Sequence, residues 1–150
     1  MTVRVQSEPF DAAAEARALT AGRSDVGAIV TFVGLCRDEG GTLAALELEH
    51  YPGMAEEEIS RVVDEACARW PLIGATAIHR YGKIAPGEDI VLVVTASAHR
   101  AAAFAAAEFL MDYLKTRAPF WKKEHRKDGS SGDWVAAKDA DDAAAERWER

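Results

Sequence analysis

One stretch of the sequence, MDYLKTRAPFWKKE (Met111 to Glu124), limits the possible folds more than any other. It begins in a run with apolar residues at helical spacing and ends in a run that alternates like a strand. Pro119 lies between the two runs, and a proline disfavours helical geometry in the residue before it. We therefore expect the helix to end near Lys115 to Arg117 and the chain to continue as a strand, with basic side chains on both sides of the turn.

The remaining sequence alternates between strand and helix patterns. Period-2 or continuous apolar runs indicate strands, and apolar spacings of three and four residues indicate helices. Strands are predicted at Val3 to Val5, Val26 to Gly34 (as a central strand), Leu46 to His50, Ala75 to Tyr81 and Asp89 to Ala96, and in a hairpin of Phe120 to Arg126 with Asp133 to Ala137. Helices are predicted from the N-cap Asp11 to near Gly22, from Ile59 to Trp70, after Ser97 as a candidate N-cap, and from Asp139 to Arg150. Several strand pairs are joined by short loops, so we predict an α+β fold with mostly antiparallel sheet and three to four helices, in a single domain spanning residues 1–150.

The overall charge argues against a general nucleic-acid-binding protein. The 150 residues carry a formal net charge of -7, whereas such a protein needs a broadly basic surface. No apolar run approaches the ~20 residues of a membrane helix, and the first residues, MTVRVQSEPF, lack the apolar core of a signal peptide. Cys36 and Cys67 are too far apart in sequence to form a disulfide framework, which favours a reducing, cytoplasmic location.

Familiar catalytic motifs do not occur in the sequence. It contains no glycine-rich phosphate loop, no G-x-S-x-G elbow and no C-x-x-C pair. The four histidines are scattered and lack the spacing of metal ligands on one helix. We therefore expect neither a bound metal nor a cofactor.

The basic residues around Pro119 are candidates for chemistry, but they also have ordinary explanations. Lys115 could compensate the partial negative charge at a helix C-terminus, which stabilises by ~0.3–1 kcal/mol. Lys122 could belong to a solvated basic edge strand that discourages edge pairing. Alternatively, the turn at Pro119 brings both lysines together. Close ammonium groups lower each other's pKa, and one then becomes a usable nucleophile or proton donor near neutral pH. On the residues alone, the two interpretations are equally supported.

Two further groups carry weaker signals. Arg37 follows an apolar strand and suits bidentate binding of a carboxylate or phosphate, although loop arginines are usually just solvated. Its neighbour Cys36 lacks a partner histidine that would make it a catalytic pair. His99 and Arg100 open a helix, where backbone N–H groups favour an anion, or they are ordinary residues of a first turn.

Four segments taken together resemble one protein family. TFVGLCR (Thr31 to Arg37), LEHYPGM (Leu48 to Met54), SAHR (Ser97 to Arg100) and the stretch from Met111 to Glu124 are similar to the large, catalytic subunit of molybdopterin synthase. The likeness covers nearly the whole chain in the expected order, and the Lys-Thr-Arg-Ala-Pro-Phe-Trp-Lys run is highly specific.

The resemblance implies a fold, a partner and a reaction. Proteins of this family have an α/β-hammerhead fold, form a homodimer and bind two copies of a small ubiquitin-like sulfur carrier, which gives a heterotetramer. The carrier's C-terminal Gly-Gly thiocarboxylate enters a pocket of the large subunit. There, sulfur is transferred to cyclic pyranopterin monophosphate (precursor Z), and two transfers produce the dithiolene of molybdopterin.

The resemblance also implies a set of site residues. The family's essential lysines correspond to Lys115 and Lys122, and its pocket arginine corresponds to Arg37. The implied substrate-binding set adds Leu35, Cys36, His99, Arg100, Lys123 and Glu124, with the His-Arg pair supplied by the neighbouring protomer. Two features depart from the family pattern: Leu35 replaces a frequent lysine, and the segment from Glu124 to Trp134 is longer and richer in charge and serine.

Two other functions are compatible with a basic site in an acidic chain. One is a non-catalytic module that binds a phosphorylated pterin and releases it unchanged. The other is an acyltransferase that uses Lys115 covalently on another carrier. Turnover of a pterin with a thiocarboxylated carrier separates the synthase from both.

Overall fold

The computed structural model describes residues 1–135 and 139–149 of the chain. In chain order the elements are β1 (Thr2–Gln6), α1 (Ala12–Thr20), β2 (Ala28–Leu35), β3 (Leu43–His50), α2 (Met54–Arg69), β4 (Leu72–Arg80), β5 (Gly82–Ile84), β6 (Asp89–Ser97), α3 (Arg100–Thr116), β7 (Phe120–Arg126) and α4 (Asp139–Glu146), followed by a 3-10 turn (Arg147–Glu149). Among the described residues, no helix is long and apolar enough to cross a membrane.

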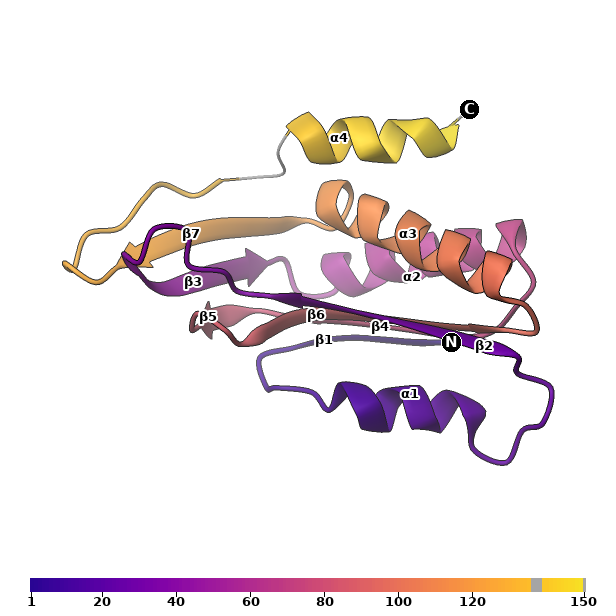
Figure 1. Cartoon of the computed structure of the whole chain (residues 1–150). Coiled ribbons are helices and arrows are strands. Elements are labelled where there is room, and N and C mark those ends of the chain that lie inside the picture. The colour runs from indigo at the N-terminus through magenta and orange to yellow at the C-terminus, as the bar shows by residue number, and fades with distance from the viewer. Residues whose placement is uncertain (136–138, 150) are drawn as a thin grey trace.

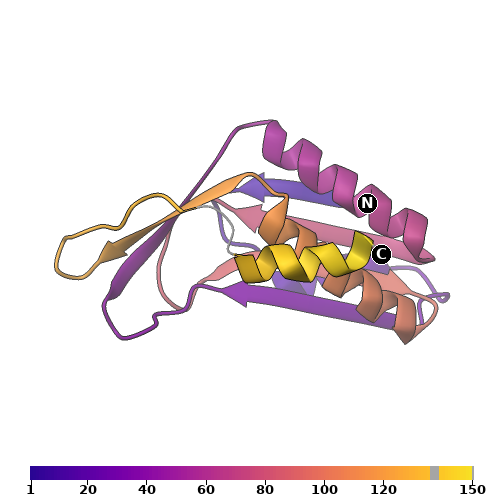
Figure 2. The same cartoon turned by 90° about the horizontal axis from the view of Figure 1, so that it is seen from above.

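The strands form two sheets that meet at one end of the molecule. The larger sheet has the order β1-β4-β6-β2, and the smaller one has the order β5-β3-β7. Every pairing is antiparallel except that of β1 with β4. Figure 1 shows α1 on one face of the larger sheet and α2 and α3 on the other, while Figure 2 shows β3 and β7 extending beyond the end of that sheet. The predicted α+β class, with mostly antiparallel sheet and three to four helices, is confirmed, with four α-helices in the described residues.

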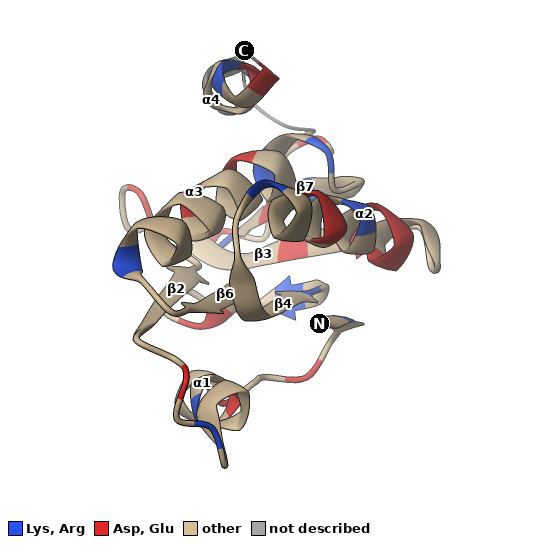
Figure 3. Cartoon of the chain, turned by 90° about the vertical axis from the view of Figure 1, so that its right-hand side faces the viewer, with Lys and Arg blue, Asp and Glu red and all other residues tan. Residues whose placement is uncertain are grey.

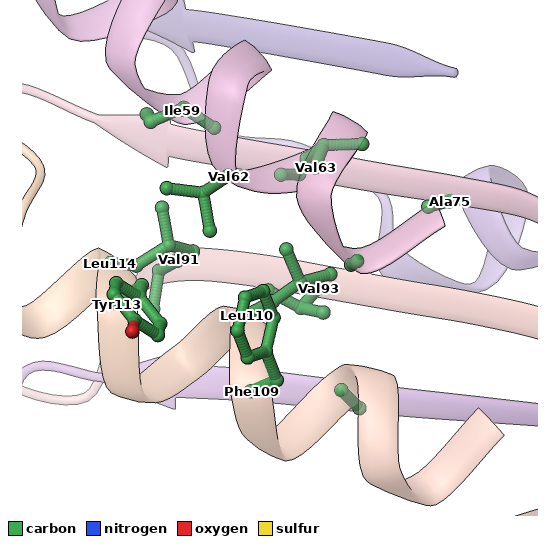
Figure 4. Packing of buried hydrophobic residues seen from close by; sticks show 13 residues of the cluster. Ile59, Val62, Val63, Ala75, Val91, Val93, Phe109, Leu110, Tyr113 and Leu114 are labelled. Carbon is green, nitrogen blue, oxygen red and sulfur yellow. The ribbon is translucent and has the colours of Figure 1, made fainter. Parts of the chain in front are cut away.

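The main core lies between the larger sheet and the helices α2 and α3. Side chains at helical spacing on these two helices, including Ile59, Val63 and Leu110, pack against Val91 and Val93 of β6 (Figure 4). Burial of each such side chain stabilises the fold by roughly 1.5–3 kcal/mol. The end-on view of Figure 3 shows the resulting layers, with α4 outermost and charges of both signs interspersed on α2 and α3. This packing fixes the position of α3, and therefore of the residues at its C-terminal end.

The strand β2 is not the central strand that its apolar sequence predicts. It lies at the edge of the larger sheet and pairs with β6, its one neighbour in that sheet. Phe32 is 41% exposed and Leu35 is 54% exposed, and Ile29 also reaches solvent. An edge strand with bare apolar side chains is a surface suited to association, because monomeric proteins normally protect such edges.

Of two further local predictions, the cap at Ser97 is wrong, and the hairpin after β7 is confirmed only as an antiparallel return of the chain. Ser97 does not cap α3: it ends β6, and its hydroxyl donates to the Pro71 carbonyl at 2.9 Å, while His99 is the N-cap residue. The segment after Asp128 forms isolated bridges instead of a second hairpin strand; Lys122 and Val135 exchange backbone hydrogen bonds of 2.9 and 2.7 Å. Residues 136 and 137 of the predicted strand and residue 150 of the predicted helix lie outside the described residues.

The C-terminal turn is held against α3 by a tryptophan and an arginine. The Trp148 ring packs edge-on against Trp70 and Phe109, with ring centroids 5.6 and 5.7 Å away. Its indole N–H donates to the Asp112 carboxylate at 2.6 Å, and Arg147 bonds the same carboxylate at 2.8 Å. The C-terminal turn thus covers part of the main core from outside α3.

Candidate functional site

Where the two sheets meet, six separate parts of the chain enclose a cavity of about 190 Å³, here called the lysine cavity. Its lining is Leu35, Cys36, Arg37, Leu46, Leu48, His79, Ile90, Leu114, Lys115, Ala118, Phe120 and Lys122. Among these described residues there are three cationic side chains and no carboxylate, although the whole chain carries a net charge of -7. Gathering like charges opposes folding unless an anion offsets their repulsion, so the cavity is suited to a negatively charged ligand.

The two lysines reach the lysine cavity from different elements. Lys115 lies in the last turn of α3, which ends at Thr116 as the proline predicts, and its side chain is exposed. Lys122 is half-buried in β7, directly opposite Leu48 of β3. The chain reversal at Ala118 and Pro119 therefore places both side chains on one cavity. The more distant Lys127 is exposed, with its ammonium 3.9 Å from Asp38, as expected for a solvated surface residue.

The segment after β2 brings Leu35, Cys36 and Arg37 to the same place. Backbone hydrogen bonds anchor it: the Cys36 N–H donates to the Glu88 carbonyl at 2.8 Å, and the Gly87 N–H donates to the Cys36 carbonyl at 2.7 Å. Burial raises the pKa of the Cys36 thiol above its ordinary value, which disfavours the reactive thiolate. Arg37 is exposed at the rim, where its guanidinium forms an ion pair with the exposed Glu39, which a bound anion would have to displace or share.

His99 and Arg100 lie away from the lysine cavity. They are exposed at the N-terminal end of α3, about 22 Å from Lys115 along the helix axis at 1.5 Å per residue. Within one chain, these two residues and the lysines are therefore at opposite ends of the same helix.

Lys123 and Glu124 occupy neighbouring surfaces. The Lys123 ammonium lies 5.5 Å from the centre of the Trp134 ring, on the face of β7 opposite to Lys122. Glu124 lines an adjacent groove of about 590 Å³, which shares Arg37, Leu46 and Lys122 with the lysine cavity. Of the nine predicted site residues, the structure brings five together around the lysine cavity, and Glu124 lies in the groove that continues from it.

The sequence reasoning missed His79 and Phe120, which line the lysine cavity. Their rings stack with centroids 3.8 Å apart and an angle of 14° between planes. Burial, together with the positive charges of Lys115, His50 and Lys122, lowers the pKa of His79 to about 4. His79 stands in a strand without any motif around it, so its role is visible only when the topology brings β4 beside α3 and β7.

Size alone does not identify the site. A larger hollow of about 960 Å³ is lined by aromatic residues such as Tyr51, Tyr81 and Trp121 and by carboxylates such as Glu49 and Glu56. It lacks every one of the predicted site residues, and its described lining contains carboxylates with no lysine or arginine to offset them, so it would repel an anion. Within residues 1–135 and 139–149, no cluster of His, Cys, Asp and Glu could hold a metal ion.

Comparisons with known proteins agree on one family. The family model described as MoaE protein matches residues 5–117. Molybdopterin synthase catalytic subunits of Mesorhizobium japonicum and Rhizobium meliloti are 71% and 67% identical to this chain; the matches cover 98% and 100% of it and 92% and 97% of those relatives.

Solved structures show the same fold. The molybdopterin biosynthesis MoaE protein from Burkholderia ambifaria has a TM-score of 0.85 at 48% identity, covering 99% of this chain and 98% of that one. A protein-protein complex of subunits 1 and 2 of molybdopterin-converting factor from Helicobacter pylori contains a chain of the same fold, with a TM-score of 0.72 at 20% identity over 91% of this chain and 90% of that one. The chain therefore belongs to the MoaE family of molybdopterin synthase catalytic subunits.

Proposed function

We propose that this chain is a sulfurtransferase that converts cyclic pyranopterin monophosphate to molybdopterin, with sulfur from the thiocarboxylated C-terminus of a small carrier subunit. The observation that carries the proposal is the convergence of Lys115, Lys122 and Arg37 on one cavity, at the meeting point of the two sheets. The substrate's phosphate and the carrier's thiocarboxylate are both anions, so a donor-rich cavity matches both. Family membership supports the same reaction.

The three cations have different roles in this proposal. Lys115 lies nearest the thiocarboxylate, where it assists proton transfer and stabilises the oxyanion that forms when the acyl carbon is attacked. Lys122 and Arg37 hold anionic parts of the substrate and of the intermediate, with Arg37 suited to bidentate contact. Leu35 and Cys36 shape the wall of the cavity, and the buried thiol takes no part in the chemistry.

The carrier's extended tail enters along the adjacent groove, whose lining cations partly offset its lining carboxylates (Arg37, Lys122 and Arg126 beside Asp38, Glu39, Glu124 and Asp133). The tail's anionic end reaches the lysine cavity through the residues that both hollows share. The pairing of subunits 1 and 2 in the Helicobacter pylori complex supports a two-subunit enzyme. Lys123 contributes from the opposite face of β7 by holding Trp134, and so the return segment, in place. The two free cysteines are consistent with a cytoplasmic location.

A homodimer completes the site in this proposal. The exposed apolar side chains of β2 supply the contact surface. His99 and Arg100 are about 22 Å from Lys115 in their own chain, so they serve the partner's cavity. Two carriers on this dimer give a heterotetramer.

The test uses the purified protein, a thiocarboxylated carrier and cyclic pyranopterin monophosphate, with dithiolene formation as the readout. We expect the wild-type protein to form product and Lys115→Ala to reduce the rate by at least ~100-fold, the typical contribution of a proton-transfer group. Lys127→Ala is the matched control, because this exposed lysine does not line the cavity. It should stay within about twofold of wild type, since surface charges contribute little.

The outcomes separate the rival functions. Full sulfur transfer by the Lys115→Ala protein would rule out its assigned role. Binding of the pterin with no product would favour a non-catalytic pterin-binding module. Turnover of the carrier without any pterin would favour an acyltransferase.

A further inference from the structure

The orientation of the His79 ring is fixed by two contacts. Its Nδ1 lies 2.8 Å from the backbone carbonyl of Arg80. A carbonyl only accepts hydrogen bonds, so Nδ1 carries the proton and donates it. The Phe120 ring, stacked at 3.8 Å, holds the imidazole plane. In the neutral ring, Nε2 then carries a lone pair and acts as an acceptor.

The surroundings of His79 keep this ring neutral. Burial is the main cause, and Lys115 from α3, His50 from β3 and Lys122 from β7 add to it, so the pKa of His79 falls to about 4. Arg37 lines the same cavity and adds to the positive field. At neutral pH the ring is an uncharged acceptor, and it does not bind anions as an imidazolium.

The acceptor atom belongs to a side chain that lines the cavity and is not fully buried. His79 is half-buried and lines the lysine cavity. Its Nε2 has no hydrogen-bond partner among the described residues. No fully buried side-chain nitrogen or oxygen of these residues lacks a partner, so Nε2 is not fully buried.

The other polar side chains that line the lysine cavity are mainly hydrogen-bond donors. The cationic side chains of Arg37, Lys115 and Lys122 only donate, and the Cys36 thiol lies 3.8 Å from the Ile84 carbonyl, which leaves it a weak acceptor at best. A ligand that carried only anionic groups would leave the His79 acceptor unsatisfied. The cavity is thus complementary to a molecule with negative groups at one end and an N–H donor at another.

We propose that the Nε2 atom of His79 accepts a hydrogen bond from a ring N–H of the bound pterin and so sets the orientation of the substrate between the two lysines. This inference rests on the proposed function, because it takes the pterin phosphate as the anion that the lysines and Arg37 hold. It gives His79 a substrate-binding role in discriminating between ligands that carry such a donor and simple phosphate compounds that lack it.

The binding test measures the dissociation constant for cyclic pyranopterin monophosphate by calorimetry with three variants. His79→Phe keeps an aromatic ring against Phe120 but removes the acceptor, so binding should weaken by about tenfold, the loss of roughly one hydrogen bond. His79→Gln keeps a side-chain acceptor and should recover to within about threefold of wild type. His125→Phe is the matched control: the His125 ring bonds Glu47 and does not line the lysine cavity, and this variant should bind like wild type.

A second measurement uses the wild-type protein and does not depend on the folding of any variant. Nitrogen-15 NMR of the histidine side chains should show His79 as the neutral tautomer with the proton on Nδ1 between pH 6 and 8. Its Nε2 resonance should shift when the pterin binds but not when inorganic phosphate binds. An imidazolium signal, the opposite tautomer, or equal binding by His79→Phe and wild type would overturn the proposal.

The outcomes for this inference and for the proposed function differ. If wild type forms dithiolene while His79→Phe binds and turns over the pterin normally, the role of His79 is wrong and the enzyme activity stands. If wild type binds the pterin through His79 but forms no dithiolene with a competent carrier, the binding role stands and the sulfurtransferase activity is wrong.

Discussion

At the scale of single residues, the environment of His79 links the site to stability. The folded chain holds the pKa of His79 at about 4, against an ordinary value of 6.5. As the pH falls below 6.5, the unfolded chain takes up a proton on this residue before the folded chain does. The stabilising contribution of the neutral ring is therefore fully present above pH 6.5 and is lost as the pH falls toward 4.

This difference predicts a pH-dependent loss of stability that a substitution removes. Between pH 7.5 and pH 5, the free energy of unfolding of the wild-type protein should fall by about 2 kcal/mol through His79 alone. His79→Gln cannot titrate, so its decrease over the same range should be smaller by that amount. Urea unfolding of both proteins at the two pH values measures the difference. Equal decreases would show that His79 titrates normally in the folded protein.

Single residues also show what the sequence could predict about the site. Lys115, Lys122 and Arg37 stood out because local positive charge in an acidic chain is unusual and because Pro119 reverses the chain between the two lysines. His79 gave no such signal, since one histidine in an apolar strand has the same pattern whether it faces a core or a cavity. Its environment arises from pairings between residues far apart in the sequence.

At the scale of elements, the C-terminal turn (Arg147–Glu149), here called the clamp, holds α3 in place through contacts with its side chains. Trp148 joins the aromatic cluster of Trp70 and Phe109 and also donates to Asp112, and Glu149 bonds Arg117 at 2.7 Å, close to the lysine-bearing end of the helix. The clamp therefore supports the part of α3 from which Lys115 projects.

Removing the clamp should reduce stability. Trp148→Ala should lower the free energy of unfolding by about 2 kcal/mol, less than the ~3–5 kcal/mol of a fully buried tryptophan, because this ring is half-buried. Trp134→Ala should cost less than about 1 kcal/mol, since that ring is 37% exposed and mainly contacts Lys123. Chemical unfolding monitored by circular dichroism compares the two. A Trp148→Ala protein as stable as Trp134→Ala would contradict the clamp.

The elements also mark where sequence reasoning reached its limit. The Asp11 cap, whose carboxylate accepts from the Ala14 N–H at 3.1 Å, and the end of α3 before Pro119 were predictable because both are set by neighbouring residues. The edge position of β2 was not predictable, because a strand covered by its own sheet and one covered by a partner chain have the same apolar pattern. The predicted helix cap at Ser97 is wrong because its hydroxyl donates to the Pro71 carbonyl, which is distant in the sequence.

At the scale of the whole molecule, several large apolar side chains are exposed to solvent, and the packing within one chain does not account for them. Phe104 on α3 is 60% exposed, and Phe32 on the neighbouring strand β2 is 41% exposed. Exposed large apolar side chains of this kind mark interaction sites in soluble proteins. The proposed homodimer contact includes the β2 side chains, with His99 and Arg100 serving the partner's cavity.

A charge in this surface should therefore disrupt both assembly and activity. Phe32→Glu should convert the dimer to a monomer, as measured by light scattering after size exclusion, and should abolish dithiolene formation although no residue of the lysine cavity is changed. Tyr51→Glu places a charge on an exposed aromatic residue outside this surface and should leave the mass unchanged. A monomeric Phe32→Glu protein with full activity would show that the site is complete within one chain.

The connection at Ala118 and Pro119 has a mechanical consequence. It joins α3, which is packed on the larger sheet, to β7, which belongs to the smaller sheet, and Tyr81 makes a similar one-residue joint between β4 and β5. Lys115 thus lies on a helix that packs on the larger sheet, and Lys122 lies in the smaller sheet. Opening or closing the angle between the sheets changes the distance between the ammonium groups and hence their mutual repulsion, which varies inversely with that distance. A protein that docks on either sheet and changes this angle would therefore change the positive charge density around the reacting carbon.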